Sequence, residues 1–146
     1  MTHPTSPRMT PAEKTQRDEL LTIREMCEAF DVTPRTLRFY EAKELLSPIR
    51  RGTARLFTYR DRARLKLILR GKRFGFSLED IRQLLDMYDR EGRQQEAQLR
   101  RTYEVAAERL AQMERQRAEL DEAIAELKEQ MDWGAGVLAA FRKAAE

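Results

Sequence analysis

The sequence predicts a mainly α fold, in which a winged helix-turn-helix domain precedes one long helix. Two short helical patterns separated by three residues lie between Thr22 and Glu44, and two short extended runs flank Gly52. From Leu99 onward, apolar residues recur at alternating spacings of four and three residues. Together these patterns indicate a compact domain over residues 21–90 and a helix that needs a partner helix.

Length and composition limit the classes of protein that the chain can represent. Of its 146 residues, 36% are charged, against roughly 25% in an average globular protein. No apolar stretch is long enough to span a membrane, and the first twenty residues show no secretory signal, so we expect a cytoplasmic protein. With one cysteine, Cys27, and one histidine, His3, a metal site or histidine-based catalysis is not expected. No nucleophile–base set or phosphate-binding glycine loop is recognisable, so we expect no enzyme.

The N-terminal part of the chain predicts a tail followed by two helices. Residues 1–20 hold three prolines among polar residues, and we expect them to be disordered. Thr22 and Glu25 have the spacing of a capping box, and an apolar stripe then predicts a short helix to Phe30. Thr33 and Pro34 suit the start of a second helix, with Leu37 and Tyr40 facing inward and basic residues facing outward.

The next segment predicts a β-hairpin and two more helices. The extended runs around Gly52 predict a hairpin, or wing, with Arg50, Arg51 and Arg55 near its tip. A third helix over residues 60–74 ends at Gly75, and Ser77 caps a fourth helix whose apolar stripe ends at Tyr88. The outward residues of the third helix are basic: Arg62, Arg64, Lys66, Arg70, Lys72 and Arg73.

Positive charge is concentrated in the predicted helix-turn-helix and wing. Residues 34–73 contain 13 Lys and Arg but only 3 Asp and Glu, whereas residues 77–146 contain 11 and 16. This asymmetry is typical of a nucleic-acid-binding domain joined to a segment with another task. A solvated basic face without a partner is the alternative. An exposed basic second helix favours entry into the major groove of double-stranded DNA, where N-terminal residues such as Arg35 and Thr36 reach base edges.

In the segment 92–131, the heptad pattern from Leu99 to Met131 predicts a coiled coil of about 45–50 Å, at 1.5 Å per residue. Because the chain holds no second heptad segment and a lone polar helix is marginal, we expect a homodimer. Arg117 is the one charged seam residue, and it either sets the register or extends its stem toward an acidic neighbour. The seam consists of Leu99, Tyr103, Ala106, Leu110, Met113, Arg117, Leu120, Ile124, Leu127 and Met131.

Residues 132–146 form a short C-terminal segment. We expect Trp133, Val137, Leu138 and Phe141 to form one face of a final short helix that begins after two glycines at 134 and 136. This face is either a hydrophobic cap on the end of the coiled coil or part of a small-molecule pocket shared across the dimer.

Five motifs between residues 22 and 81 occur in a fixed order and spacing. They are Thr22-Ile23-Arg24-Glu25-Met26, Val32-Thr33-Pro34-Arg35-Thr36-Leu37-Arg38-Phe39-Tyr40-Glu41, Leu45-Leu46-Ser47-Pro48, Arg55-Leu56-Phe57-Thr58 and Gly75-Phe76-Ser77-Leu78-Glu79-Asp80-Ile81. In this order the chain resembles the MerR family of bacterial transcription regulators over residues 22–90. The Arg-Phe-Tyr-Glu motif alone is weak, whereas the ordered set is specific.

The resemblance implies a winged helix-turn-helix dimer whose long helices pair antiparallel. It further implies recognition of an inverted-repeat operator, distortion of the promoter DNA, and RNA polymerase as a partner at the promoter. Two departures, Ala54 before the wing arginine and Phe39 in place of a common tyrosine, each remove one polar or aromatic contact. By resemblance the DNA-binding residues are Thr33, Arg35, Thr36, Arg38, Phe39, Tyr40, Arg50, Arg51, Arg55, Lys72 and Arg73.

The signal that the protein senses is less defined by the sequence. Metal and thiol sensors of the family carry cysteines behind the long helix, and here no Cys or His lies beyond residue 30. The short tail and the Arg-Gly-Thr of the wing resemble a subgroup linked to fatty-acid or branched-chain amino-acid breakdown, which would give an acyl-CoA effector. An alternative function is a MerR-like protein-interaction module that acts through its coiled coil without specific DNA reading.

Overall fold

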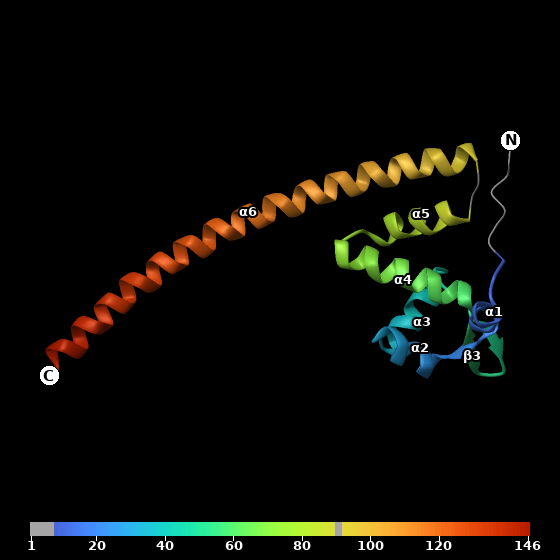
Figure 1. Cartoon of the computed structure of the whole chain (residues 1–146), viewed down its shortest axis with the longest axis horizontal. Coiled ribbons are helices and arrows are strands. Elements are labelled where there is room, and N and C mark those ends of the chain that lie inside the picture. Colours follow the sequence, from blue (N-terminus) through green and yellow to red (C-terminus); the bar gives the residue numbers. More distant parts are fainter. Residues whose placement is uncertain (1–7, 90–91) are drawn as a thin grey trace. The chain divides into compact units, whose positions relative to one another are not determined.

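The computed structural model describes residues 8–89 and 92–146. The chain divides between Leu99 and Arg100 into an N-terminal and a C-terminal unit. The mainly α fold class is confirmed, with a short sheet in the N-terminal unit (Figure 1). The elements are α1 (Pro11–Asp18), β1 (Leu21–Thr22), α2 (Ile23–Phe30), α3 (Pro34–Ala42), β2 (Ile49–Arg51), β3 (Ala54–Phe57), α4 (Tyr59–Phe74), α5 (Leu78–Tyr88) and α6 (Arg93–Ala144).

Side-chain caps fix where the helices of the N-terminal unit begin. Thr22 and Glu25 close the predicted capping box of α2, and α5 begins at the predicted cap, Ser77. The hydroxyl of Thr33 accepts a hydrogen bond from the backbone N–H of Thr36, with Pro34 in the first turn of α3. These caps satisfy N–H groups that have no partner within the helix, so the sequence determines the helix starts locally.

The sheet has three strands in the order β1-β3-β2, all antiparallel. The hairpin of β2 and β3 turns at Gly52, whose φ of 61° is the left-handed conformation that glycine adopts without a steric penalty. The predicted wing is therefore present. Strand β1 was not predicted. It has two residues, which are too few to show an alternating pattern, and Thr22 is also the cap of α2.

The core of the N-terminal unit joins all its main elements. Its buried residues are Met26, Leu37, Tyr40, Leu45, Leu46, Phe57, Leu65, Ile68, Ile81 and Leu85. Helices α4 and α5 approach closely at Gly71, where an added Cβ would lie 2.8 Å from Cγ1 of Ile81. The predicted inward position of Tyr88 is wrong, because Tyr88 is exposed and Met87 is buried in its place.

The predicted disorder of residues 1–20 is wrong for α1. A capping box between Thr10 and Glu13 starts this helix, and Pro11 occupies its first turn. A guanidinium nitrogen of Arg62 donates to the backbone carbonyl of Glu19 at 2.8 Å, which ties the end of this segment to α4. Residues 1–7 of the predicted tail lie outside the described residues.

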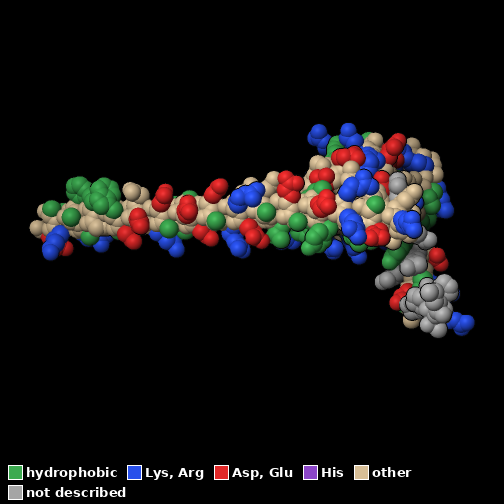
Figure 2. All heavy atoms as spheres, turned by 90° about the horizontal axis from the view of Figure 1, so that it is seen from above, with side chains coloured by type: hydrophobic (Ala, Val, Ile, Leu, Met, Phe, Trp, Pro, Cys, Tyr) green, Lys and Arg blue, Asp and Glu red, His purple; other side chains and the backbone are tan. Residues whose placement is uncertain are grey.

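Helix α6 runs without interruption from Arg93 to Ala144. The predicted break at Gly134 and Gly136 is wrong, because the flanking residues favour a helix strongly enough to continue through two glycines. All the predicted seam residues except Ala106, which is half-buried, are exposed on the single chain. Acidic and basic side chains alternate along α6, and hydrophobic side chains gather near its C-terminal end (Figure 2).

Within residues 8–89 and 92–146, no helix combines the length and the apolar character that crossing a bilayer requires.

Candidate nucleic-acid interface

The surface of α3 carries the first set of predicted site residues. Because Leu37 and Tyr40 are buried, Arg35 and Arg38 are left exposed, three residues apart and so on one side of the helix. Thr36 is half-buried, and its hydroxyl lies 3.0 Å from that of Thr33. The structure therefore brings two free guanidinium groups and the capped start of the helix together on one face.

The aromatic pair of α3 separates into an exposed and a buried ring. Phe39 is exposed, and its ring centroid lies 5.7 Å from that of Tyr40. Tyr40 is fully buried in the core, so its expected place beside DNA phosphates is not met. The physical reason is that Tyr40 lies on the inward side of α3 with Leu37, where both belong to the core cluster.

The wing is joined to α3 through Glu41. The Arg50 side chain donates from Nε at 3.1 Å and from Nη2 at 2.8 Å to Oε1 of Glu41, and Nε of Arg55 donates at 2.6 Å to Oε2. Arg51 is exposed. Sequence reasoning placed Arg50 and Arg55 at the wing tip but missed Glu41, although the signature motif ends on it.

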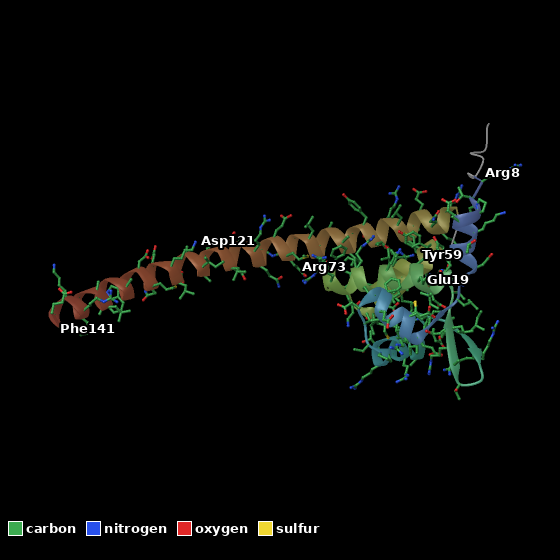
Figure 3. All side chains as sticks on the ribbon, turned by 60° about the horizontal axis from the view of Figure 1, so that its bottom comes forward. Arg8, Glu19, Tyr59, Arg73, Asp121 and Phe141 are labelled. Carbon is green, nitrogen blue, oxygen red and sulfur yellow. The ribbon has the colours of Figure 1, made fainter. Side chains whose placement is uncertain are left out.

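The basic face of α4 divides between exposed and structural residues. Lys72 and Arg73 are exposed near its C-terminal end, where Figure 3 labels Arg73. The Lys72 ammonium lies 6.0 Å from the ring centroid of Tyr40. The prediction that Arg64 faces outward is wrong. Its side chain is 16% exposed, with Nε donating to the carbonyl of Leu45 at 2.7 Å and Nη1 donating to Asp89.

A cavity of about 770 Å³ lies in the N-terminal unit, and Arg64 is among the residues of α2, α4 and α5 that line it. Glu19 and Tyr59 also line this cavity (Figure 3). Sequence reasoning missed this cavity, since its walls come from segments far apart in the chain. Among residues 8–89 and 92–146, no three His, Cys, Asp or Glu side chains gather as a metal site requires.

Two family models match the chain over the elements just described. The model "MerR HTH family regulatory protein" matches residues 21–88, and the model "MerR, DNA binding" matches residues 62–130. The chain belongs to the MerR family. Together the two models match residues 21–130, which hold the helix-turn-helix, the wing and most of the predicted seam. This part of the chain is therefore that of a MerR-family DNA-binding protein.

Individual relatives agree with this membership. The HTH-type transcriptional regulator ZntR of Escherichia coli K12 is 42% identical over 67 residues, which are 44% of this chain and 48% of that protein. The MerR-family chain thus spans about half the length of the curated relatives it matches. A MerR-family transcriptional regulator from Bacillus cereus is 28% identical with a TM-score of 0.59, covering 77% of this chain and 82% of that one. A regulator structure from Listeria monocytogenes, 22% identical with a TM-score of 0.60 over 86% and 99% of the two chains, shares the fold.

Proposed function

We propose that this MerR-family protein is a homodimeric, sequence-specific transcription regulator. The observation that carries the proposal is the exposed pair of Arg35 and Arg38 on α3, a helix whose opposite side is fixed in the core. In helix-turn-helix proteins this second helix enters the major groove and its first residues reach the base edges.

The proposed DNA contacts fall into two classes. Arg35, Thr36 and Arg38 would read bases, since an arginine that hydrogen-bonds both acceptors of a guanine contributes about 1–3 kcal/mol of discrimination. The exposed residues Phe39, Arg51, Lys72 and Arg73, together with Arg50 and Arg55, would contact the backbone and hold the register. Thr33 would act by fixing the start of α3. Tyr40 is buried in the core, and we assign it no DNA contact.

Helix α6 supports the proposed homodimer. Its seam places apolar side chains such as Leu110, Leu120 and Leu127 in solvent on a single chain. An apolar seam of this length is stable when a second helix covers it, and a two-fold axis provides that helix without another protein. By family, we propose that the helices pair antiparallel, so that two reading units recognise an inverted repeat.

Substitution of the seam tests the dimer. Leu120→Glu removes two buried leucines per dimer, each worth about 1.5–3 kcal/mol, so we expect the dimer dissociation constant to rise about 100-fold or more. Ala118→Glu introduces the same charge two residues away on the outer side of the helix and is expected to leave association unchanged. Analytical ultracentrifugation measures both. Equal effects of the two variants would refute the seam.

The family further supports distortion of promoter DNA, with RNA polymerase as a partner and the bacterial cytoplasm as the compartment. At the end of α6, Trp133, Leu138 and Phe141 are exposed. We propose that they cap the end of the dimer, or line an effector pocket with the partner subunit.

Selection of genomic fragments tests the regulator. The purified full chain is mixed with sheared bacterial DNA, bound fragments are sequenced, and the most enriched fragment is titrated with salt. Recovery of a two-fold symmetric promoter site that keeps its preference at physiological salt supports the proposal. Recovery of unrelated fragments that all dissociate together as salt rises would contradict it, because counterion release alone then explains the affinity. Function would in that case lie with protein partners of α6.

A further inference from the structure

Glu41 is the one carboxylate in the described structure that joins the wing to the recognition helix. It lies in the last turn of α3, and it binds Arg50 of β2 and Arg55 of β3 through separate carboxylate oxygens. Its side chain is 19% exposed, against 22% for Arg55 and 51% for Arg50. The bond from Arg55 is part-buried and is therefore stronger and less screened by salt than a surface ion pair, whereas the bonds from Arg50 are exposed.

The strand register explains why a carboxylate is needed there. Arg50 and Arg55 are direct cross-strand partners in the β2–β3 ladder. Two like charges opposite one another destabilise a hairpin. By accepting from both side chains, Glu41 offsets this repulsion and fixes the hairpin against the end of α3.

We propose that Glu41 is a specificity-determining positioning residue, an inference that rests on the proposed DNA-binding function. Glu41 occupies the site on Arg50 and Arg55 that a DNA phosphate would otherwise take, so it competes with phosphates for both arginines. A guanidinium has five N–H donors. The donors of Arg50 and Arg55 that do not bind Glu41 can reach a phosphate only while Glu41 holds the wing at its present distance from α3. Binding to arbitrary DNA is thereby weakened more than binding to a site that α3 fits.

The test compares Glu41→Gln with Glu28→Gln in the full chain. Both substitutions remove one negative charge, but Glu28 lies on α2 and pairs with Arg24 of the same helix, at 3.5 Å on the exposed surface. Dissociation constants are measured for the selected operator and for a random duplex between 50 and 200 mM salt.

For Glu41→Gln we expect tighter binding to the random duplex and a salt slope steeper by about 0.9, which is about 3.5-fold more loss over this fourfold salt range. The operator-to-random ratio should fall roughly tenfold, the equivalent of one charge-assisted hydrogen bond. Glu28→Gln should leave the ratio unchanged.

A double variant separates charge from position. Glu41→Gln with Arg50→Gln restores the net charge, so the salt slope should return to the wild-type value while the ratio stays low. If Glu41→Gln and Glu28→Gln change the ratio and slope equally, or if the double variant recovers the ratio, the positioning role is overturned. A wild-type protein that prefers no duplex overturns the proposed function itself, and this result is read before any variant is made.

Discussion

Removal of the Asp61 carboxylate should destabilise the N-terminal unit more than removal of any other helix cap that the structure describes. Asp61 is 2% exposed and lies in the first turn of α4. One of its oxygens accepts from the backbone N–H of Ser47 at 2.9 Å, and the other accepts from the N–H and hydroxyl of Thr58, each at 3.0 Å. The same side chain thus caps α4 and anchors the segment that enters the wing.

The magnitude follows from these contacts. Loss of the cap costs about 1 kcal/mol. Loss of the bond from Ser47, which leaves a part-buried N–H without a partner, adds about 1–3 kcal/mol. Asp61→Ala should therefore cost about 2–4 kcal/mol, and since 1 kcal/mol shifts the melting temperature of a domain this size by about 4–8 °C, the expected decrease is roughly 8–32 °C.

Asp80→Ala is the matched control. Asp80 closes the capping box of α5 with Ser77 by the same two bonds, in an exposed place and with no bond to another element. It should cost about 1 kcal/mol. Thermal unfolding is followed by far-ultraviolet circular dichroism. All variants are compared at one protein concentration, because association shifts the transition. Equal decreases for the two variants would refute the anchoring role of Asp61.

Three further outcomes are expected. Gly136→Ala should stabilise α6 by about 0.5–1 kcal/mol, since nothing lies within 4 Å of the added carbon. Gly71→Ala should instead destabilise the N-terminal unit, because the added carbon would contact Ile81. Urea unfolding measures both free energies, and stabilisation by Gly71→Ala would contradict the packing of α4 on α5. Arg35→Ala should relax base preference, whereas Lys72→Ala should weaken all sequences alike and flatten the salt slope by about one; indistinguishable binding profiles would refute these roles. Burial raises the pKa of Glu41, but the bonds from Arg55 and Arg50 outweigh it and hold that pKa below its ordinary value of 4.5. Its stabilisation is therefore complete above the unfolded-state pKa and is lost as pH falls through the lower folded-state pKa. The difference in unfolding free energy between wild type and Glu41→Gln should shrink as pH falls below 4.5, and a constant difference would show that the ion pairs contribute nothing.

The parts of the fold that depend on short-range chemistry were predictable. The Thr22–Glu25 box, the Pro34 start, the Gly75 end and the Ser77 cap each involve residues within four positions of one another, so the sequence shows them directly. The long helix α6 was predictable for the same reason, since apolar residues at alternating spacings of four and three lie on one face of a helix.

What the sequence did not reveal depends on tertiary contacts or on competing local signals. Glu41 acts across nine and fourteen residues, and Arg64 reaches the carbonyl of Leu45 only because α4 packs beside it. Burial of Tyr40 was predicted from periodicity, while its role beside phosphates came from the family pattern, and the structure satisfies only the first. The prediction for residues 1–20 gave too much weight to the prolines and too little to the Thr10–Glu13 cap that starts α1. The predicted break in α6 gave too much weight to the glycines at 134 and 136 and too little to the helix-forming residues around them.

The pairing of β1 with β3 makes the wing and the first helix of the helix-turn-helix mechanically continuous. Thr22 is the Cα partner of Leu56 in β3, and its hydroxyl at the same time caps α2. A rotation of the hairpin about its base must therefore pull on the first turn of α2 or break the two-residue ladder. We therefore expect a force on the wing to reach the start of α2 through this ladder, so that the hairpin and α2 move together.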